Sequence, residues 1–247
     1  MRKMFLALAA GLLSLPAFAQ GAHVPVYRGY TSSAAVATSL QLSLPAYSAA
    51  GDFAVLFFSN TWPTPIPAGW TTVYTYTTGL WNVGVASKTL TSNDISTDKV
   101  TVSEAMGNPA FDLHAGLVVY QGSTVDGVLE TQDFNTSGSG YDYLTTSSSP
   151  LKGDVILFWA SDREGQPYGP TEPYIWDGEG NPVNGTPNVF STSLETANAW
   201  SVFEWQPMQA GSFSTGYYFA SPGGGNGQLG VQVVVKCHAV NGTCIVN

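Results

Sequence analysis

One acidic side chain lies in surroundings that could support acid catalysis. Glu204 belongs to the aromatic run Trp200-Ser201-Val202-Phe203-Glu204-Trp205. An apolar environment raises the pKa of a carboxyl group and lets it carry a proton at neutral pH. Glycoside hydrolysis needs such an acid together with a second carboxylate at a defined distance. We predict that Glu204 is a hydrogen-bonded or outward-facing strand residue, and polysaccharide hydrolysis or cleavage through Glu204 is the alternative.

A long polar segment, residues 162–198, contains three aromatic side chains, Tyr168, Tyr174 and Trp176. Flat rings stack on the faces of sugars, and they expose apolar area at a low cost in side-chain entropy. Together with Trp62 from an earlier loop, they form a hypothetical carbohydrate-binding platform. In the competing interpretation the rings only pack this segment onto the body of the protein.

The same segment contains an alternation of oxygen-bearing side chains. Asp177, Glu179 and Asn181 have the spacing that begins a calcium-binding loop. However, Pro182 stands where that loop needs a glycine, and Asn188 stands where it needs a bidentate glutamate. We therefore interpret the segment as ordinary turns, with Ca²⁺ as a weak alternative and no other cofactor expected.

The sequence gives little support for nucleophilic catalysis. It has no Gly-x-Ser-x-Gly motif, and its only histidines are His23, His114 and His238. A triad that joins His114 to Asp112 is conceivable, but residues two positions apart rarely converge on one site. We expect His114 to be a structural histidine.

The two cysteines, Cys237 and Cys244, lie near the C-terminus on either side of the turn signal Asn241-Gly242. A hairpin would place the two cysteines opposite each other, and exported proteins form disulfides. We predict a structural disulfide. A zinc site is the weaker interpretation, because zinc needs more ligands than two cysteines and the adjacent His238.

The N-terminus carries an export signal. Arg2 and Lys3 precede the apolar stretch 5–15, which is too short to span a bilayer, and Ala17-Phe18-Ala19 is a cleavage pattern. We predict that residues 1–19 are a signal peptide and that the mature protein begins at Gln20, without membrane insertion. The mature protein is then secreted, periplasmic or on the cell surface.

Composition excludes two classes of protein. The chain has 247 residues, of which 44% are hydrophobic and 13% aromatic, and this is too apolar for a disordered protein. Its 17 acidic residues outnumber its 8 lysines and arginines. Nucleic acid is therefore an improbable partner, because its phosphates are bound by clustered basic residues.

Short β-branched and aromatic runs between turn residues predict an all-β protein, a two-sheet β-sandwich of jelly-roll-like type. Runs that are apolar on both faces predict central strands. The stretch 135–150 is rich in serine, threonine and glycine and is interpreted as a mobile connection. The expected strands are 35–44, 53–59, 71–76, 81–89, 99–103, 115–120, 155–160, 199–205, 216–219 and 232–239.

The chain contains an internal repeat. Gly51-Asp52 followed by an apolar strand aligns with Gly153-Asp154 at an offset of 102 residues. Further matches follow in the same order, Trp81-Asn82-Val83 with Trp200-Ser201-Val202, and 117–120 with 233–235. We predict one domain, residues 20–247, made from half-repeats of roughly 26–134 and 135–247. Asp52 and Asp154 are interpreted as turn caps.

A family resemblance rests on three motifs: Gly51-Asp52, then Pro65-Ile66-Pro67-Ala68-Gly69-Trp70-Thr71, then Tyr120-Gln121-Gly122. The chain resembles a poorly characterised β-sandwich module with a "GD…PPxGWT…YxG" pattern, found in bacterial secreted proteins and in phage structural or tail-fibre proteins. In this chain the usual double proline is split by Ile66. The resemblance implies a β-sandwich in a cell-surface or virion-like setting, and it implies no catalytic residues.

The favoured expectation is therefore an exported, non-enzymatic recognition or structural module whose partner is a surface glycan or a protein. The first alternative is a polysaccharide hydrolase or lyase. The second is a self-assembling structural subunit.

Overall fold

A computed structural model of the chain describes residues 24–60, 63–77, 82–105, 112–136, 140–146, 150–162, 170–177, 188–194, 199–205, 207, 211–219, 228–239 and 244. These residues form antiparallel strands almost throughout, which confirms the all-β prediction. Among them, no helix is both long enough and apolar enough to span a membrane.

The chain divides into two halves of similar construction. The N-terminal half contains β1 (Tyr27–Val36), β2 (Ser39–Ser43), β3 (Phe53–Asn60), β4 (Thr71–Thr77), β5 (Asn82–Thr89), α1 (Ser92–Thr97), β6 (Lys99–Ser103) and β7 (Asp112–Tyr120). A short 3-10 helix, η1 (Gly122–Thr124), leads to the C-terminal half. That half contains β8 (Val125–Thr136), β9 (Gly140–Thr145), β10 (Val155–Asp162), β11 (Pro170–Asp177), β12 (Asn188–Leu194), β13 (Ala199–Trp205), β14 (Phe213–Phe219) and β15 (Gln228–Cys237).

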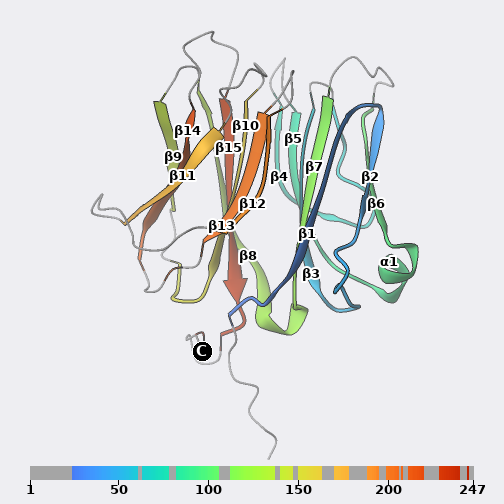
Figure 1. The fold of residues 1–247 in the computed structure, drawn as a ribbon. Coiled ribbons are helices and arrows are strands. Elements are labelled where there is room, and N and C mark those ends of the chain that lie inside the picture. Colours follow the sequence, from blue (N-terminus) through green and yellow to red (C-terminus); the bar gives the residue numbers. More distant parts are fainter. Residues whose placement is uncertain are drawn as a thin grey trace, which may run out of the picture.

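Four sheets lie in layers (Figure 1). The first central sheet has the strand order β1-β7-β3-β5-β4, and the second has the order β12-β13-β10-β15-β8. An outer sheet of β2 and β6 covers the first central sheet, and an outer sheet of order β11-β14-β9 covers the second. The expected two-sheet sandwich is thus the central pair of a four-layer structure.

The alternation of side chains along β3 and β10 explains why four layers form. In β3, Val55 and Phe57 face the second central sheet, while Leu56 and Phe58 face β2 and β6. Because both faces of the strand are apolar, each face needs a cover. The ring of Phe57 meets the ring of Trp159 between the central sheets, with centroids 6.4 Å apart.

The seven strands of the first half have counterparts in the second half, which contains β11 as an additional strand. The order β1-β7-β3-β5-β4 corresponds to β8-β15-β10-β13-β12, and β2 and β6 correspond to β9 and β14. In each half the pairs nest, with the first strand beside the last. The strand alignment inferred from Gly51-Asp52 and Gly153-Asp154 therefore agrees with the topology. β8 belongs to the second half, so this half begins near Val125 rather than near residue 135.

All four edge strands of the central sheets carry an irregularity in register. The shifts lie between Tyr27 and Gly29 in β1 and between Thr72 and Tyr74 in β4. Corresponding shifts occur where β8 meets β15 and between Val189 and Ser191 in β12. Bulges bend an edge strand and discourage pairing with another chain. The repeated bulges therefore protect the sandwich against edge-to-edge association.

Several elements lie where the sequence predicts loops. The expected connection 135–150 contains β9, and the long polar segment 162–198 contains β11 and β12. β1 begins well before the expected strand 35–44, which is divided between β1 and β2. The six-residue helix α1 follows from a capping box, in which the Thr91 hydroxyl and the Asp94 carboxylate bond each other's backbone N–H groups.

Candidate functional site

The three motifs of the first half, which contain Asp52, Trp70 and Gly122, meet at one end of the central sheet. The Asp52 carboxylate accepts bonds from the N–H groups of Ala49, at 2.8 Å, and Gly122, at 3.4 Å. Trp70 ends a turn closed by its own N–H and the Pro67 carbonyl, and its ring packs against the core beneath β2 and β6. These contacts confirm that Asp52 is a turn cap, and they give the family-like pattern a structural role.

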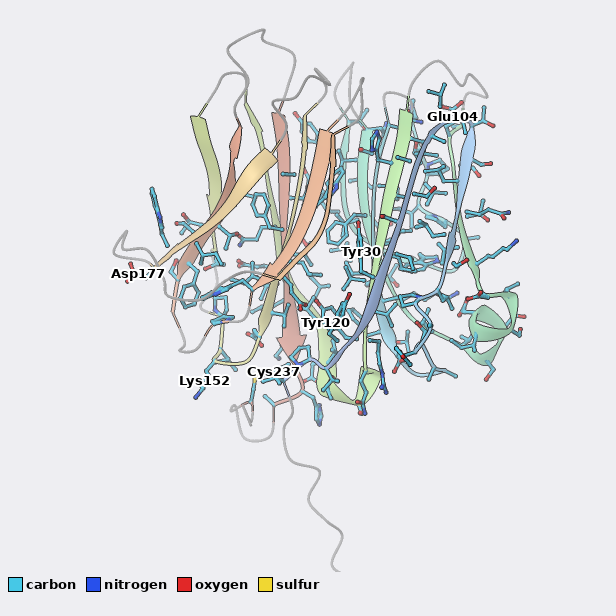
Figure 2. All side chains as sticks on the ribbon, in the orientation of Figure 1. Tyr30, Glu104, Tyr120, Lys152, Asp177 and Cys237 are labelled. Carbon is cyan, nitrogen blue, oxygen red and sulfur yellow. A yellow bond between two sulfur atoms is a disulfide. The ribbon has the colours of Figure 1, made fainter. Side chains whose placement is uncertain are left out.

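Asp154 makes the equivalent contacts in the second half. Its carboxylate accepts bonds from the N–H groups of Leu151, at 2.8 Å, and Cys237, at 2.9 Å. The side chain is fully buried, and this burial raises the pKa of the Asp154 carboxyl above its usual value. Cys237 forms the predicted disulfide with Cys244, and their Cα atoms lie 6.2 Å apart. Figure 2 places Cys237 at the lower end of the molecule.

Removing this disulfide is expected to weaken the fold measurably. The bond closes a short loop, since the two cysteines are seven positions apart, and a loop of this size gives a stabilisation of about 2 kcal/mol. Chemical unfolding of the Cys237→Ser, Cys244→Ser variant should show this loss relative to the oxidised protein. The wild-type protein treated with a reductant should show a similar loss, whereas equal stability of all three forms would contradict a structural bridge.

Glu204 joins the two central sheets through a hydrogen bond. The hydroxyl of Tyr120, a fully buried residue of β7 that is labelled in Figure 2, donates to Glu204 Oε2 at 2.6 Å, and Tyr27 meets Tyr120 edge to face. Burial, followed by the negative charge of Glu204, raises the pKa of Tyr27 to about 12 and that of Tyr120 well above its usual value. In this bond the carboxylate oxygen of Glu204 is the acceptor, and it links β13 of the second central sheet to β7 of the first.

The two described histidines have different surroundings. His114 in β7 is only 1% exposed, and burial lowers its pKa to about 4, so it is neutral at physiological pH and out of reach of a substrate. His238 is exposed, and its Nδ1 lies 2.7 Å from Asp126 Oδ1. The structural interpretation of His114 agrees with this burial, and His23 lies outside the described residues.

An open groove of about 460 Å³ lies between β4, the edge of the first central sheet, and β8, the edge of the second. Hydroxyl groups dominate its polar lining, which comprises Thr71, Thr72, Tyr74, Ser87 and Thr131. Glu130 adds a carboxylate, and Val128 and Leu129 add apolar area. The lining thus combines hydrogen-bonding groups with apolar surface and has little charge.

The internal repeat explains why this groove is open. Val55 pairs with Ser87 as Leu157 pairs with Glu204, so Ser87 and Glu204 occupy equivalent positions. By the same comparison of registers, Val128 is the counterpart of Tyr27. The large side chains of Tyr27 and Glu204 fill the gap between the sheets on their side of the sandwich. Their smaller counterparts, Val128 and Ser87, leave a space on the other side.

Only part of the aromatic platform can be placed. Tyr174 and Trp176 lie on β11, whereas Tyr168 and Trp62 lie outside the described residues. Between them, Ile175 faces the core of the C-terminal half, and Trp176 is half-buried. Of the weak calcium candidates, Asp177 ends β11 at the outer edge of the molecule (Figure 2), and Glu179 and Asn181 lie outside the described residues.

No sequence motif indicates the groove, because its lining comes from strands of different halves. Comparison with known proteins adds no assignment: no family model, no curated protein and no solved structure matches the chain.

Proposed function

We propose that the protein is an exported, non-enzymatic recognition module whose ligand is a neutral carbohydrate. The groove between β4 and β8 carries this proposal. Its row of hydroxyl groups and the Glu130 carboxylate match the many donors and acceptors of a sugar chain, and Tyr74 and Val128 offer apolar area. The disulfide is compatible with an oxidising compartment, as export requires.

The charge of the chain favours a neutral ligand. Acidic residues outnumber basic ones by 17 to 8, and the groove lining, as far as the structure describes it, contains a glutamate and no lysine or arginine. A polyanionic ligand would be repelled by such a surface. The bulged edges of the central sheets also disfavour an added strand, whether from a peptide or from a second copy of the chain.

A screen of residues 20–247 against immobilised neutral glycans and polysaccharides, with calcium present, tests the proposal. We expect saturable binding that falls about tenfold in Glu130→Ala, because one carboxylate that accepts sugar hydroxyl groups is worth about 1.4 kcal/mol. Trp176→Ala should bind like the wild type. Loss of binding in Trp176→Ala with full binding in Glu130→Ala would move the site to β11, and no binding to any glycan would contradict the proposal.

A further inference from the structure

The two sulfur atoms of the disulfide and a carboxylate converge at the lower end of the C-terminal half. One potential ligand atom each from Asp154, Cys237 and Cys244 lies within 4.8 Å of the other two. All three residues are buried, with exposed fractions of 0%, 0% and 4%. In the oxidised protein the sulfurs are bonded to each other and hold nothing else.

We propose that the reduced protein binds one soft divalent cation, of which Zn²⁺ is the representative, through Asp154, Cys237 and Cys244. Two thiolates and one carboxylate are established zinc ligands, and a water molecule completes the tetrahedron. Ligand atoms around such an ion lie roughly 3.5–3.8 Å apart. Opening the disulfide lets the sulfurs separate to this spacing, and the carboxylate is already close enough to need only a small shift.

The backbone orients the carboxylate for this role. The N–H group of Cys237 bonds Asp154 Oδ1, and that of Leu151 bonds Oδ2, so each oxygen keeps a further lone pair. Hydrogen bonds that fix a ligand in place strengthen a metal site. Cys237 at the end of β15 and Asp154 are therefore already held together by a hydrogen bond in the metal-free protein.

The two halves differ in the side chains that lie beside this carboxylate. In the first half the equivalent carboxylate, Asp52, has Arg28 Nε at 3.5 Å from its Oδ2. Arg28 is the bulge residue of β1, and the matching bulge residue of β8 is Leu129. The second half thus has a leucine in place of the arginine and two cysteines beside the carboxylate, and the positive charge of Lys236 also acts on Asp154.

Metal binding requires prior reduction of the disulfide. A water-soluble phosphine reduces the disulfide to two thiols and is oxidised to the phosphine oxide; water supplies the oxygen of the phosphine oxide and the two protons of the thiols. Binding of Zn²⁺ then forms two zinc–sulfur bonds and one zinc–oxygen bond, and it releases the two thiol protons. The affinity of the site should therefore rise with pH.

Titration of the phosphine-reduced protein with Cd²⁺, followed by the ultraviolet charge-transfer band of cadmium thiolates, tests the site. We expect one ion per chain, displaced by Zn²⁺, no band in oxidised wild type, and no high-affinity binding in Cys244→Ser. Asp154→Asn should bind at least tenfold more weakly. Its matched control is Asp52→Asn, which loses the equivalent turn cap and should bind like the wild type.

A second measurement uses the wild-type protein alone, in case Asp154→Asn does not fold. Zn²⁺ should slow the alkylation of both cysteines in the reduced protein at least tenfold, because the metal-bound thiolates are shielded. An unchanged alkylation rate, or equal Cd²⁺ affinity of Asp154→Asn and Asp52→Asn, would overturn the proposal. Equal binding of Cd²⁺ by the oxidised and the reduced protein would also overturn the proposal.

Discussion

Replacing Gly122 by alanine is expected to lower the free energy of unfolding by about 3 kcal/mol or more. A Cβ atom at this position would lie 1.6 Å from the carbonyl oxygen of Gly51 and 2.7 Å from its carbon. Both atoms belong to the backbone, so no side-chain rotation relieves the clash. The Gly51 segment is itself held, because its N–H group bonds the carbonyl of Leu90.

Urea unfolding of Gly122→Ala measures this effect, and Gly211→Ala is the matched control. At Gly211 the nearest atom to an added Cβ is 3.6 Å away, which is ordinary contact, so that variant should differ from the wild type by less than about 1 kcal/mol. Equal stability of the two variants would contradict the close packing of the Gly51-Asp52 and Tyr120-Gln121-Gly122 motifs. The family-like pattern would then need another explanation.

Acidification from pH 7.5 to pH 5 is expected to cost the folded protein about 2 kcal/mol through His114 alone. Burial lowers the pKa of His114 to about 4, whereas the unfolded chain has a pKa near 6.5. Between these values the unfolded state binds a proton that the folded state does not. The contribution of His114 to the free energy of unfolding is therefore fully present above pH 6.5, and it is lost as the pH falls toward 4.

Unfolding free energies of the wild type and His114→Gln at both pH values isolate this contribution. The variant should lose most of the pH-dependent decline, even if its stability at pH 7.5 is lower. His238→Gln is the control, because that exposed side chain should leave the decline largely intact. A decline of equal size in His114→Gln and the wild type would show that other groups cause the acid sensitivity.

The apolar strands and the internal repeat could be predicted because their signals are local. Each Gly-Asp turn precedes a strand that is apolar on both faces, and β3 and β10 lie where this pattern predicts. β11 was missed because Pro170 and Pro173 argue against a strand. The structure accommodates both prolines because β11 is an edge strand of its sheet.

The candidate sites depend on contacts between distant parts of the chain, which a single sequence does not reveal. The disulfide was predictable from a short hairpin, but the approach of Asp154 to Cys237 spans 83 positions. The groove can be recognised only from the pairing registers of β4 and β8, including their bulges. These registers show that Val128 occupies the position that Tyr27 has in the other half. Glu204 appeared as a lone acid in an aromatic run, and only the packing of the sheets brings Tyr120 to it.

Calorimetric titration of Val128→Tyr with the best glycan from the screen tests the central claim most directly. This substitution gives the groove the residue that Tyr27 provides at the equivalent place in the other half, and the groove should be filled. We expect binding to fall at least tenfold in Val128→Tyr and to persist in the reciprocal variant, Tyr27→Val, with both proteins folded by circular dichroism. Undiminished affinity in folded Val128→Tyr would show that the ligand binds elsewhere and would contradict the groove as the recognition site.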